Sequence, residues 1–128
     1  MVQRAVPPPD IEPLEFFTCW VPRSVSGDPD RRRSLGDTRA TLVFELSGTG
    51  GGIFTLHLDA GEVRGSVGDR SGVENGERRA PDLRIRLDLE TWKSLNAGAL
   101  SAPEAFLRRR VTLEGDLALA VKLHFLLG

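Results

Sequence analysis

The sequence predicts an α+β fold built as a single domain. Its 128 residues match the usual size of one domain and suffice to bury about two thirds of the surface that the unfolded chain exposes. Between residues 39 and 87, apolar and polar side chains alternate in several short segments, which is the period of β-strands. After residue 88, helical spacing dominates, with one further strand. Strands gathered apart from helices indicate an antiparallel-rich sheet with helices on one face.

The N-terminal part is predicted to hold one helix. Residues 1–10 are expected to be a disordered lead, because three consecutive prolines favour an extended backbone. Apolar residues recur at helical spacing from Ile11 to Arg23, and Pro22 should end this helix. The polar residues 24–37 are interpreted as a loop. Residues 11–128 together form the folded domain in this prediction.

Alternation predicts four strands in the centre of the chain. They cover residues 39–46, 53–58, 63–67 and 83–87. The glycine-rich residues 48–52 are interpreted as a hairpin turn, because a phosphate-binding loop would be followed by a helix and here a strand follows. The polar, glycine-punctuated residues 68–80 leave room for a short irregular strand.

The C-terminal third is predicted to contain three helices and a fifth strand. A short helix should begin at Asp88 or Leu89 and stop at Gly98, and Ser101 with Glu104 forms a capping-box pattern for the next helix. A strand over 111–114 precedes a final helix over 117–126. That helix is apolar nearly all round, so it should either pack under the sheet and another helix or wall a cavity.

Composition excludes several classes of protein. The formal net charge of −1 gives no basic field for nucleic acid. The lone cysteine, Cys19, excludes an intramolecular disulfide and is expected to be a small buried residue. No apolar stretch is long enough to span a membrane and no signal peptide is visible, so the expected location is cytoplasmic. The sequence does not indicate the oligomeric state.

Two arginine clusters stand out, Arg31–Arg33 and Arg108–Arg110. We expect both to be solvated surface. The alternative is transient contact with an anionic membrane surface, where each arginine contributes about 1 kcal/mol.

Few residues are available for catalysis. Tyrosine is absent, and the only histidines, His57 and His124, have no second histidine or cysteine at metal-ligand spacing. No Gly-x-Ser-x-Gly elbow is present. The sequence therefore predicts no catalytic residue, no metal and no cofactor, and the chain is not expected to be an enzyme. An enzyme would need His124 or Asp116 to be buried beside a pocket with a shifted pKa.

Several stretches together resemble the type-2 sterol carrier protein family. These are Ala80–Leu87, Glu90–Gly98 and Val111–Leu123, which give an Asp-Leu strand, a short helix ending in glycine, and an apolar strand followed by Gly-Asp and a Leu-Ala-rich helix. Residues 52–61 resemble the central hairpin of that family. The resemblance covers about residues 38–127; one departure is Arg109-Arg110, where members often carry a glycine.

The resemblance implies a five-stranded, largely antiparallel sheet, helices over one face and a hydrophobic tunnel between them. It also implies reversible, non-catalytic binding of a sterol, fatty acyl chain or other lipid, with transfer as an extension. The alternatives are a small enzyme or accessory domain acting on a lipid or polyketide-like substrate, and a protein-interaction module with a filled cavity. The expected ligand-binding residues are Phe44, Leu56, Trp92, Leu95, Leu100, Phe106, Leu107, Leu117, Ala120, Val121 and His124, the last of which would meet a polar head.

Overall fold

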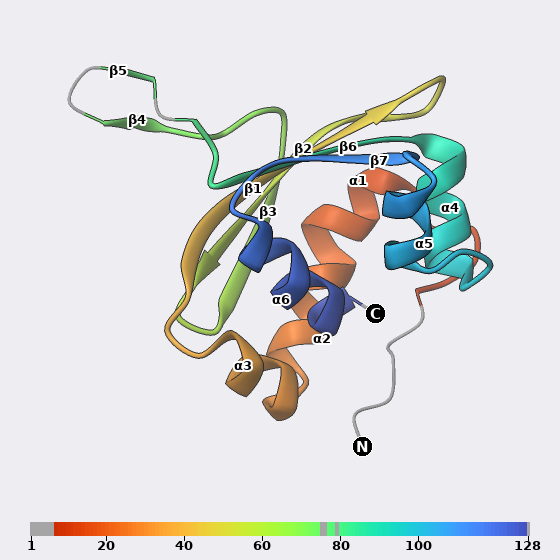
Figure 1. Cartoon of the computed structure of the whole chain (residues 1–128). Coiled ribbons are helices and arrows are strands. Elements are labelled where there is room, and N and C mark those ends of the chain that lie inside the picture. Colours follow the sequence, from red (N-terminus) through yellow and green to blue (C-terminus); the bar gives the residue numbers. More distant parts are fainter. Residues whose placement is uncertain (1–6, 75–76, 79, 128) are drawn as a thin grey trace.

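A mixed five-stranded sheet organises the fold (Figure 1). The computed structural model describes residues 7–74, 77–78 and 80–127. The strand order is β3-β2-β1-β6-β7, and every neighbouring pair is antiparallel except β1 and β6. The strands are β1 (Arg39–Ser47), β2 (Gly52–Asp59), β3 (Glu62–Val67), β6 (Leu83–Asp88) and β7 (Val111–Gly115). The predicted five strands and the largely antiparallel sheet are confirmed, with strand ends within one residue of their predicted positions.

The parallel pair requires the chain to cross from one edge of the sheet, at β3, to β6. Thr55 on β2 holds the start of this crossing against the outer face of the sheet. Its hydroxyl donates to the carbonyl of Gly68 at 2.6 Å and accepts from the backbone N–H of Arg70 at 2.9 Å. The crossing also contains two short strands, β4 (Val73–Glu74) and β5 (Glu77–Arg78), which pair as a projecting hairpin (Figure 1).

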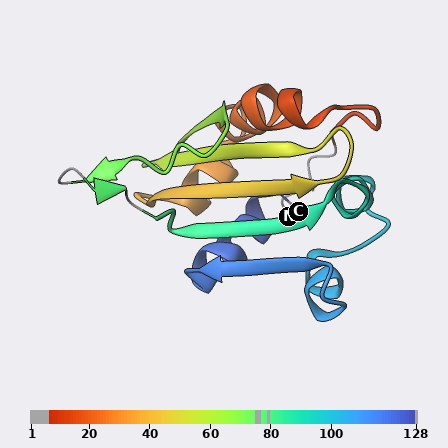
Figure 2. The ribbon, with the colours of Figure 1, turned by 90° about the horizontal axis from the view of Figure 1, so that it is seen from above.

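The helices lie on the opposite, inner face of the sheet (Figures 1 and 2). They are α1 (Pro13–Glu15), the π-helical η1 (Phe16–Trp20), α2 (Val21–Ser26), α3 (Pro29–Leu35), α4 (Leu89–Ala97), α5 (Ala102–Leu107) and α6 (Leu117–Leu127). Within the described part of the chain, none of them has the length and apolar character needed to cross a membrane. Of the predicted disordered lead, residues 1–6 lie outside the described residues, and the carbonyl of Pro8 accepts a hydrogen bond from Ile11 at 3.1 Å.

The prediction that Pro22 ends the first helix is wrong. The helix continues to Ser26, with Pro22 in the first turn of α2. The preceding turn is π-helical, and the N–H of Val21 donates to the carbonyl of Phe16, five residues earlier. Proline has no backbone N–H, so an α-helix loses a hydrogen bond where a proline stands. Here the wider π-helical turn changes the hydrogen-bond partners just before Pro22.

The predicted loop over residues 24–37 is also wrong in part, because it contains α3. Asp28 caps this helix by accepting hydrogen bonds from the backbone N–H groups of Asp30 and Arg31, and Pro29 occupies the first turn. An aspartate followed by proline is a helix-start signal that the polar composition of the segment concealed.

The remaining helix predictions are confirmed, and α4 and α5 carry the predicted caps. The Asp88 carboxylate accepts from the N–H of Thr91 at 2.7 Å, and left-handed Gly98 ends α4. The Ser101 hydroxyl accepts from the N–H of Glu104 at 3.2 Å at the start of α5. These caps orient both helices beside the end of the sheet, where β6 finishes and β7 begins.

Candidate functional site

A cluster of aromatic side chains lies between the sheet and the helices, within the hydrophobic core. Phe17 of η1 lies at the centre, with ring centroids 4.8 Å from Phe44 of β1 and 5.0 Å from Phe54 of β2. Phe16 meets Trp92 of α4 edge to face at 5.2 Å. All five side chains are buried. They form a continuous apolar interior, which we call the aromatic core, between the inner sheet face and helices η1 and α4.

Gly65 brings η1 onto the sheet. A Cβ atom at this position of β3 would lie 2.6 Å from the carbonyl carbon of Phe17 and 3.1 Å from the Cα of Thr18, so only glycine allows this approach. The contact fixes Phe16 and Phe17 over the sheet and therefore positions the aromatic core.

The predicted ligand-binding residues divide into two groups. Phe44, Leu56, Trp92 and Leu100 are buried, and Leu95 and Ala120 are partly buried against the same hydrophobic core.

The second group lies on the surface. Phe106 and Leu107 of α5 are 50% and 80% exposed, and Leu117 and Val121 of α6 are 55% and 59% exposed. His124 belongs to α6, but its side chain lies outside what the structure describes. Helix α6 therefore shows apolar side chains to solvent as well as to the core, which it meets through Leu119 and Ala120.

Arg31 is a buried cation that sequence reasoning missed. The prediction that the Arg31–Arg33 cluster is solvated holds for its last two members, but Arg31 is 3% exposed. Its Nε atom lies 3.3 Å from a carboxylate oxygen of Asp28, and its buried Nη1 has no hydrogen-bond partner within the described residues. Arg31 precedes the buried Leu35 by four residues, so it shares the inward face of α3, a signal that requires the helix to be known first.

Trp92 supplies a second unpaired donor. Its ring is buried in the aromatic core, and its Nε1 atom is buried without a hydrogen-bond partner among residues 7–74, 77–78 and 80–127. Buried polar groups are nearly always paired, so an unpaired donor marks a place where a bound polar group would lower the free energy.

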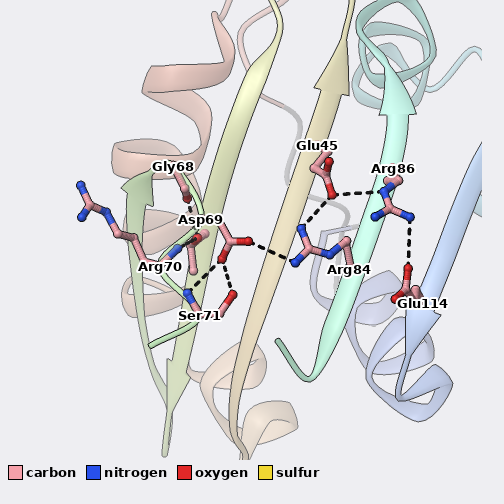
Figure 3. Close-up of polar contacts among 9 residues, drawn as sticks. Glu45, Gly68, Asp69, Arg70, Ser71, Arg84, Arg86 and Glu114 are labelled. Atoms are coloured by element: carbon pink, nitrogen blue, oxygen red, sulfur yellow. Dashed lines mark hydrogen bonds and ion pairs between the residues drawn. The ribbon is translucent and has the colours of Figure 1, made fainter. Parts of the chain in front are cut away.

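The outer face of the sheet carries a paired charge network (Figure 3). Arg84 of β6 contacts Glu45 of β1 at 2.8 Å and Asp69 of the crossing at 3.1 Å. Arg86 contacts the same Glu45 at 3.2 Å and Glu114 of β7 at 3.1 Å. These pairs tie three neighbouring strands to the crossing segment.

Hydrogen bonding keeps the carboxylates of this network ionised. The guanidinium of Arg84 lowers the pKa of Glu45, with Arg86 adding a smaller effect. The hydroxyl of Ser71, followed by Arg84, lowers the pKa of Asp69. Carboxylates stabilised in this way are weak bases, so the network is suited to structure rather than to proton transfer.

A recess of about 650 Å³ opens where β1, β6 and β7 meet the loop after α5. The recess is lined by charged side chains, by apolar side chains and by backbone atoms. The charged residues that line it are Glu45, Arg86, Asp88, Arg109 and Arg110. This recess differs from the aromatic core, because its lining includes several charged groups and it opens to solvent.

Cys19 is exposed, and the prediction that it is buried is wrong. It lies on η1 with the exposed Glu15 four residues earlier, whereas Phe16 and Phe17 take the inward face.

Comparison with solved structures places the fold among known ones. The chain superposes on the inverting sec-alkylsulfatase Pisa1 from Pseudomonas with a TM-score of 0.67 and 22% identity, covering 92% of this chain and 16% of that one. It superposes on palmitated SCP2L2 from Aedes aegypti with a TM-score of 0.57 and 19% identity, covering 82% and 84% of the two chains.

Sequence comparison gives the family. The chain is 28% identical over 120 residues to hydroxysteroid dehydrogenase-like protein 2 from Xenopus laevis, a match that covers 93% of this chain but only 26% of that protein. The model of the SCP-2 sterol transfer family matches residues 23–128. With its five-stranded sheet, its helices on one face and this match over most of its length, the chain belongs to the SCP-2 sterol transfer family.

Proposed function

We propose that this protein binds a hydrophobic ligand reversibly and without chemical change, and that it transfers the ligand between membranes. The aromatic core is the observation that carries the proposal. It is a broad apolar interior covered by the short elements η1 and α4 and by α6, and burial of apolar ligand surface there contributes about 25 cal/mol per Å². Membership of a sterol transfer family supports it, as does the similarity to the palmitated protein from Aedes aegypti.

The proposed ligand site lies between the inner sheet face and the helices η1, α4 and α6. Its walls would be the buried and partly buried members of the predicted set, namely Phe44, Leu56, Trp92, Leu95, Leu100 and Ala120. Leu117, Val121 and His124 belong to the same helix and would line the route by which a ligand enters. Helix α6 is tied to the start of β1 by Lys122, whose Nζ donates to the Thr38 hydroxyl at 2.6 Å. Movement of α6 about this tie would open the tunnel that the family resemblance implies.

The unpaired donors favour a particular kind of ligand. Arg31 Nη1 and Trp92 Nε1 can donate a hydrogen bond but cannot accept one. Both atoms are buried without a partner in the described part of the chain. A ligand with an acceptor at its polar end, such as a carboxylate or a hydroxyl, would satisfy one of them. An ammonium head group offers only donors and would bring a positive charge toward Arg31.

A role beside an enzyme is the second candidate. The chain spans about a quarter of the Xenopus relative and a smaller part of the alkylsulfatase, so the corresponding regions are minor parts of larger proteins. We propose that the chain could present a bound lipid to such a partner. A reducing, cytoplasmic location would suit its single exposed cysteine.

Native mass spectrometry tests this proposal. The purified protein is incubated separately with palmitate, cholesterol and hexadecylamine, and the stoichiometry of each complex is measured. We expect a one-to-one complex with palmitate or cholesterol and none with hexadecylamine. If no lipid binds, the interior is filled and the chain is an interaction module; if a bound lipid is chemically converted, the non-catalytic proposal is wrong.

A further inference from the structure

The exposed turn at the end of α5 combines two apolar side chains with three cations. Phe106 and Leu107 are 50% and 80% exposed, and Arg108, Arg109 and Arg110 follow them directly, all exposed. We call residues 106–110 the α5 turn. It lies at the β7 edge of the sheet, on the periphery of the molecule (Figure 2). Apolar side chains next to basic ones are the combination that binds the interface of an anionic bilayer.

Most of the charge in this turn is not neutralised. Arg108 pairs with Glu104 at 2.7 Å. Arg109 and Arg110 form no ion pair within 4.0 Å with any carboxylate whose side chain the structure describes, although Asp88 is near enough for Arg110 to help lower the pKa of that carboxyl. Both also line the open recess described above, which could receive a lipid phosphate.

The backbone at Arg109 adds an independent observation. Its φ of 60° is in the left-handed region. Its N–H donates to the carbonyl of Phe106 at 3.0 Å and the N–H of Arg110 donates to that of Ala105 at 2.9 Å, which is the Schellman pattern that ends helices. Glycine adopts this conformation without strain and arginine does not. The protein is therefore less stable with arginine at this position than it would be with glycine. That cost points to a function for the arginine side chain.

We propose that the α5 turn is the surface by which this protein docks on an anionic phospholipid bilayer. Phe106 and Leu107 enter the interface between head groups and acyl chains, and Arg109 and Arg110 contact lipid phosphates. The proposal rests on the proposed function in one respect, namely that a lipid carrier must meet a membrane to load and unload. It also assigns Phe106 and Leu107 to the docking surface instead of the ligand site.

Vesicle flotation of the full chain tests the docking surface. Phosphatidylcholine vesicles are compared with vesicles that also contain phosphatidylserine, at low and at high salt. We expect binding to the anionic vesicles only, weakened by salt. Leu107→Ser should weaken vesicle binding about tenfold, as expected when one leucine side chain is no longer buried in the bilayer. Arg109→Gly should weaken it about fivefold, corresponding to one phosphate contact, and should raise Tm because the strain is removed.

Two controls match these variants. Leu14→Ser removes an apolar side chain that is 53% exposed on α1, and Arg33→Ala removes an arginine whose side chain is 79% exposed on α3. Both should leave vesicle binding within about twofold, as is usual for surface changes outside an interface. Equal losses in the controls would mean that docking is not localised to the α5 turn and would overturn the proposal.

Palmitate binding in solution separates this proposal from the proposed function. All four variants should bind palmitate as the parent does. A parent that binds palmitate but not anionic vesicles would overturn the docking proposal alone, and so would an Arg109→Gly variant that binds vesicles like the parent. If Leu107→Ser abolishes palmitate binding, Leu107 belongs to the ligand site and the docking assignment is wrong. Vesicle binding without palmitate binding would support the docking surface and contradict the proposed function.

Discussion

Replacing Gly65 with alanine tests how η1 is seated on the sheet. In an ordinary strand this change is neutral or favourable, because alanine restricts the unfolded chain and contributes about 0.4–1 kcal/mol of stability. Here the new Cβ would lie 2.6 Å from the carbonyl carbon of Phe17 and closer still to its oxygen. Ordinary carbon–carbon contacts are about 3.5–4.0 Å, so β3 and η1 must separate by roughly 1 Å.

That separation should lower the free energy of unfolding. Overpacking of a well-filled interior typically costs about 1–3 kcal/mol, and here both partners are backbone and cannot change rotamer. After subtraction of the gain from the unfolded state, we expect a net loss of about 2 kcal/mol, or roughly 6–10 °C in Tm for a domain of this size. Because Phe16 and Phe17 move with η1, the aromatic core should loosen as well.

Urea denaturation followed by tryptophan fluorescence measures the effect. Ser66→Ala is the matched control, since Ser66 is the next residue of β3, faces the other side and has a buried hydroxyl without a partner in the described part of the chain. Because the hydroxyl that is lost has no partner, the free energy of unfolding of Ser66→Ala should equal that of the parent or exceed it. If Gly65→Ala proves as stable as the parent or more so, η1 does not pack on β3 as described.

Three further predictions concern buried charge, pH and the thiol. Asp28→Ala should lower the free energy of unfolding by about 3 kcal/mol, because it removes a helix cap and leaves the buried guanidinium of Arg31 without its counter-ion. Ser101→Ala removes only a cap and should lower it by about 1 kcal/mol. Equal losses in urea denaturation would contradict this prediction. Since Arg84 lowers the pKa of Glu45 below its ordinary value of 4.5, the stability from this pair is present above pH 4.5 and is lost as the pH falls through the lowered value. The acid-induced drop in Tm should therefore be smaller in Arg84→Met than in the parent, and an unchanged drop would refute the link. Cys19 should react with a thiol reagent in the native protein at nearly the rate seen in urea, and strong protection would show that it is buried.

The strands could be predicted from sequence because each buries one face against the same core. Leu42, Phe44 and Leu46 alternate with side chains on the outer face, and the period of two survives even where the outer face is covered by the crossing segment. The parallel pairing of β1 and β6 could not be predicted in this way, because alternation describes the faces of a strand and not its neighbours.

The helical errors have local causes. A single π-helical turn before Pro22 carried the helix past the residue that should have ended it. The start of α3 was encoded by Asp28 and Pro29 but was concealed by polar residues. Because α3 was not recognised, the inward position of Arg31 could not be inferred. The face on which a residue lies can be predicted only when the helix that contains it is known.

Part of the candidate site was predictable and part was not. Trp92 and Leu100 follow the rule that large apolar residues are buried, and they are. Phe106 and Leu107 are exposed, because burial is only a tendency of apolar residues and much of the surface of a folded protein is apolar. Which apolar residues of α5 are exposed depends on how this helix packs between α4 and β7, and the sequence pattern does not specify that packing.

Energy transfer from Trp92 to a bound fatty acid tests the central claim most directly. The chain has two tryptophans, so the Trp20→Phe protein retains Trp92 as its only tryptophan, in the aromatic core. Titration with the fluorescent polyene cis-parinaric acid should quench Trp92 emission until one equivalent is bound, and palmitate should restore the emission. If the probe leaves Trp92 emission unchanged, or quenches it without saturation, the ligand does not enter the interior between the sheet and the helices.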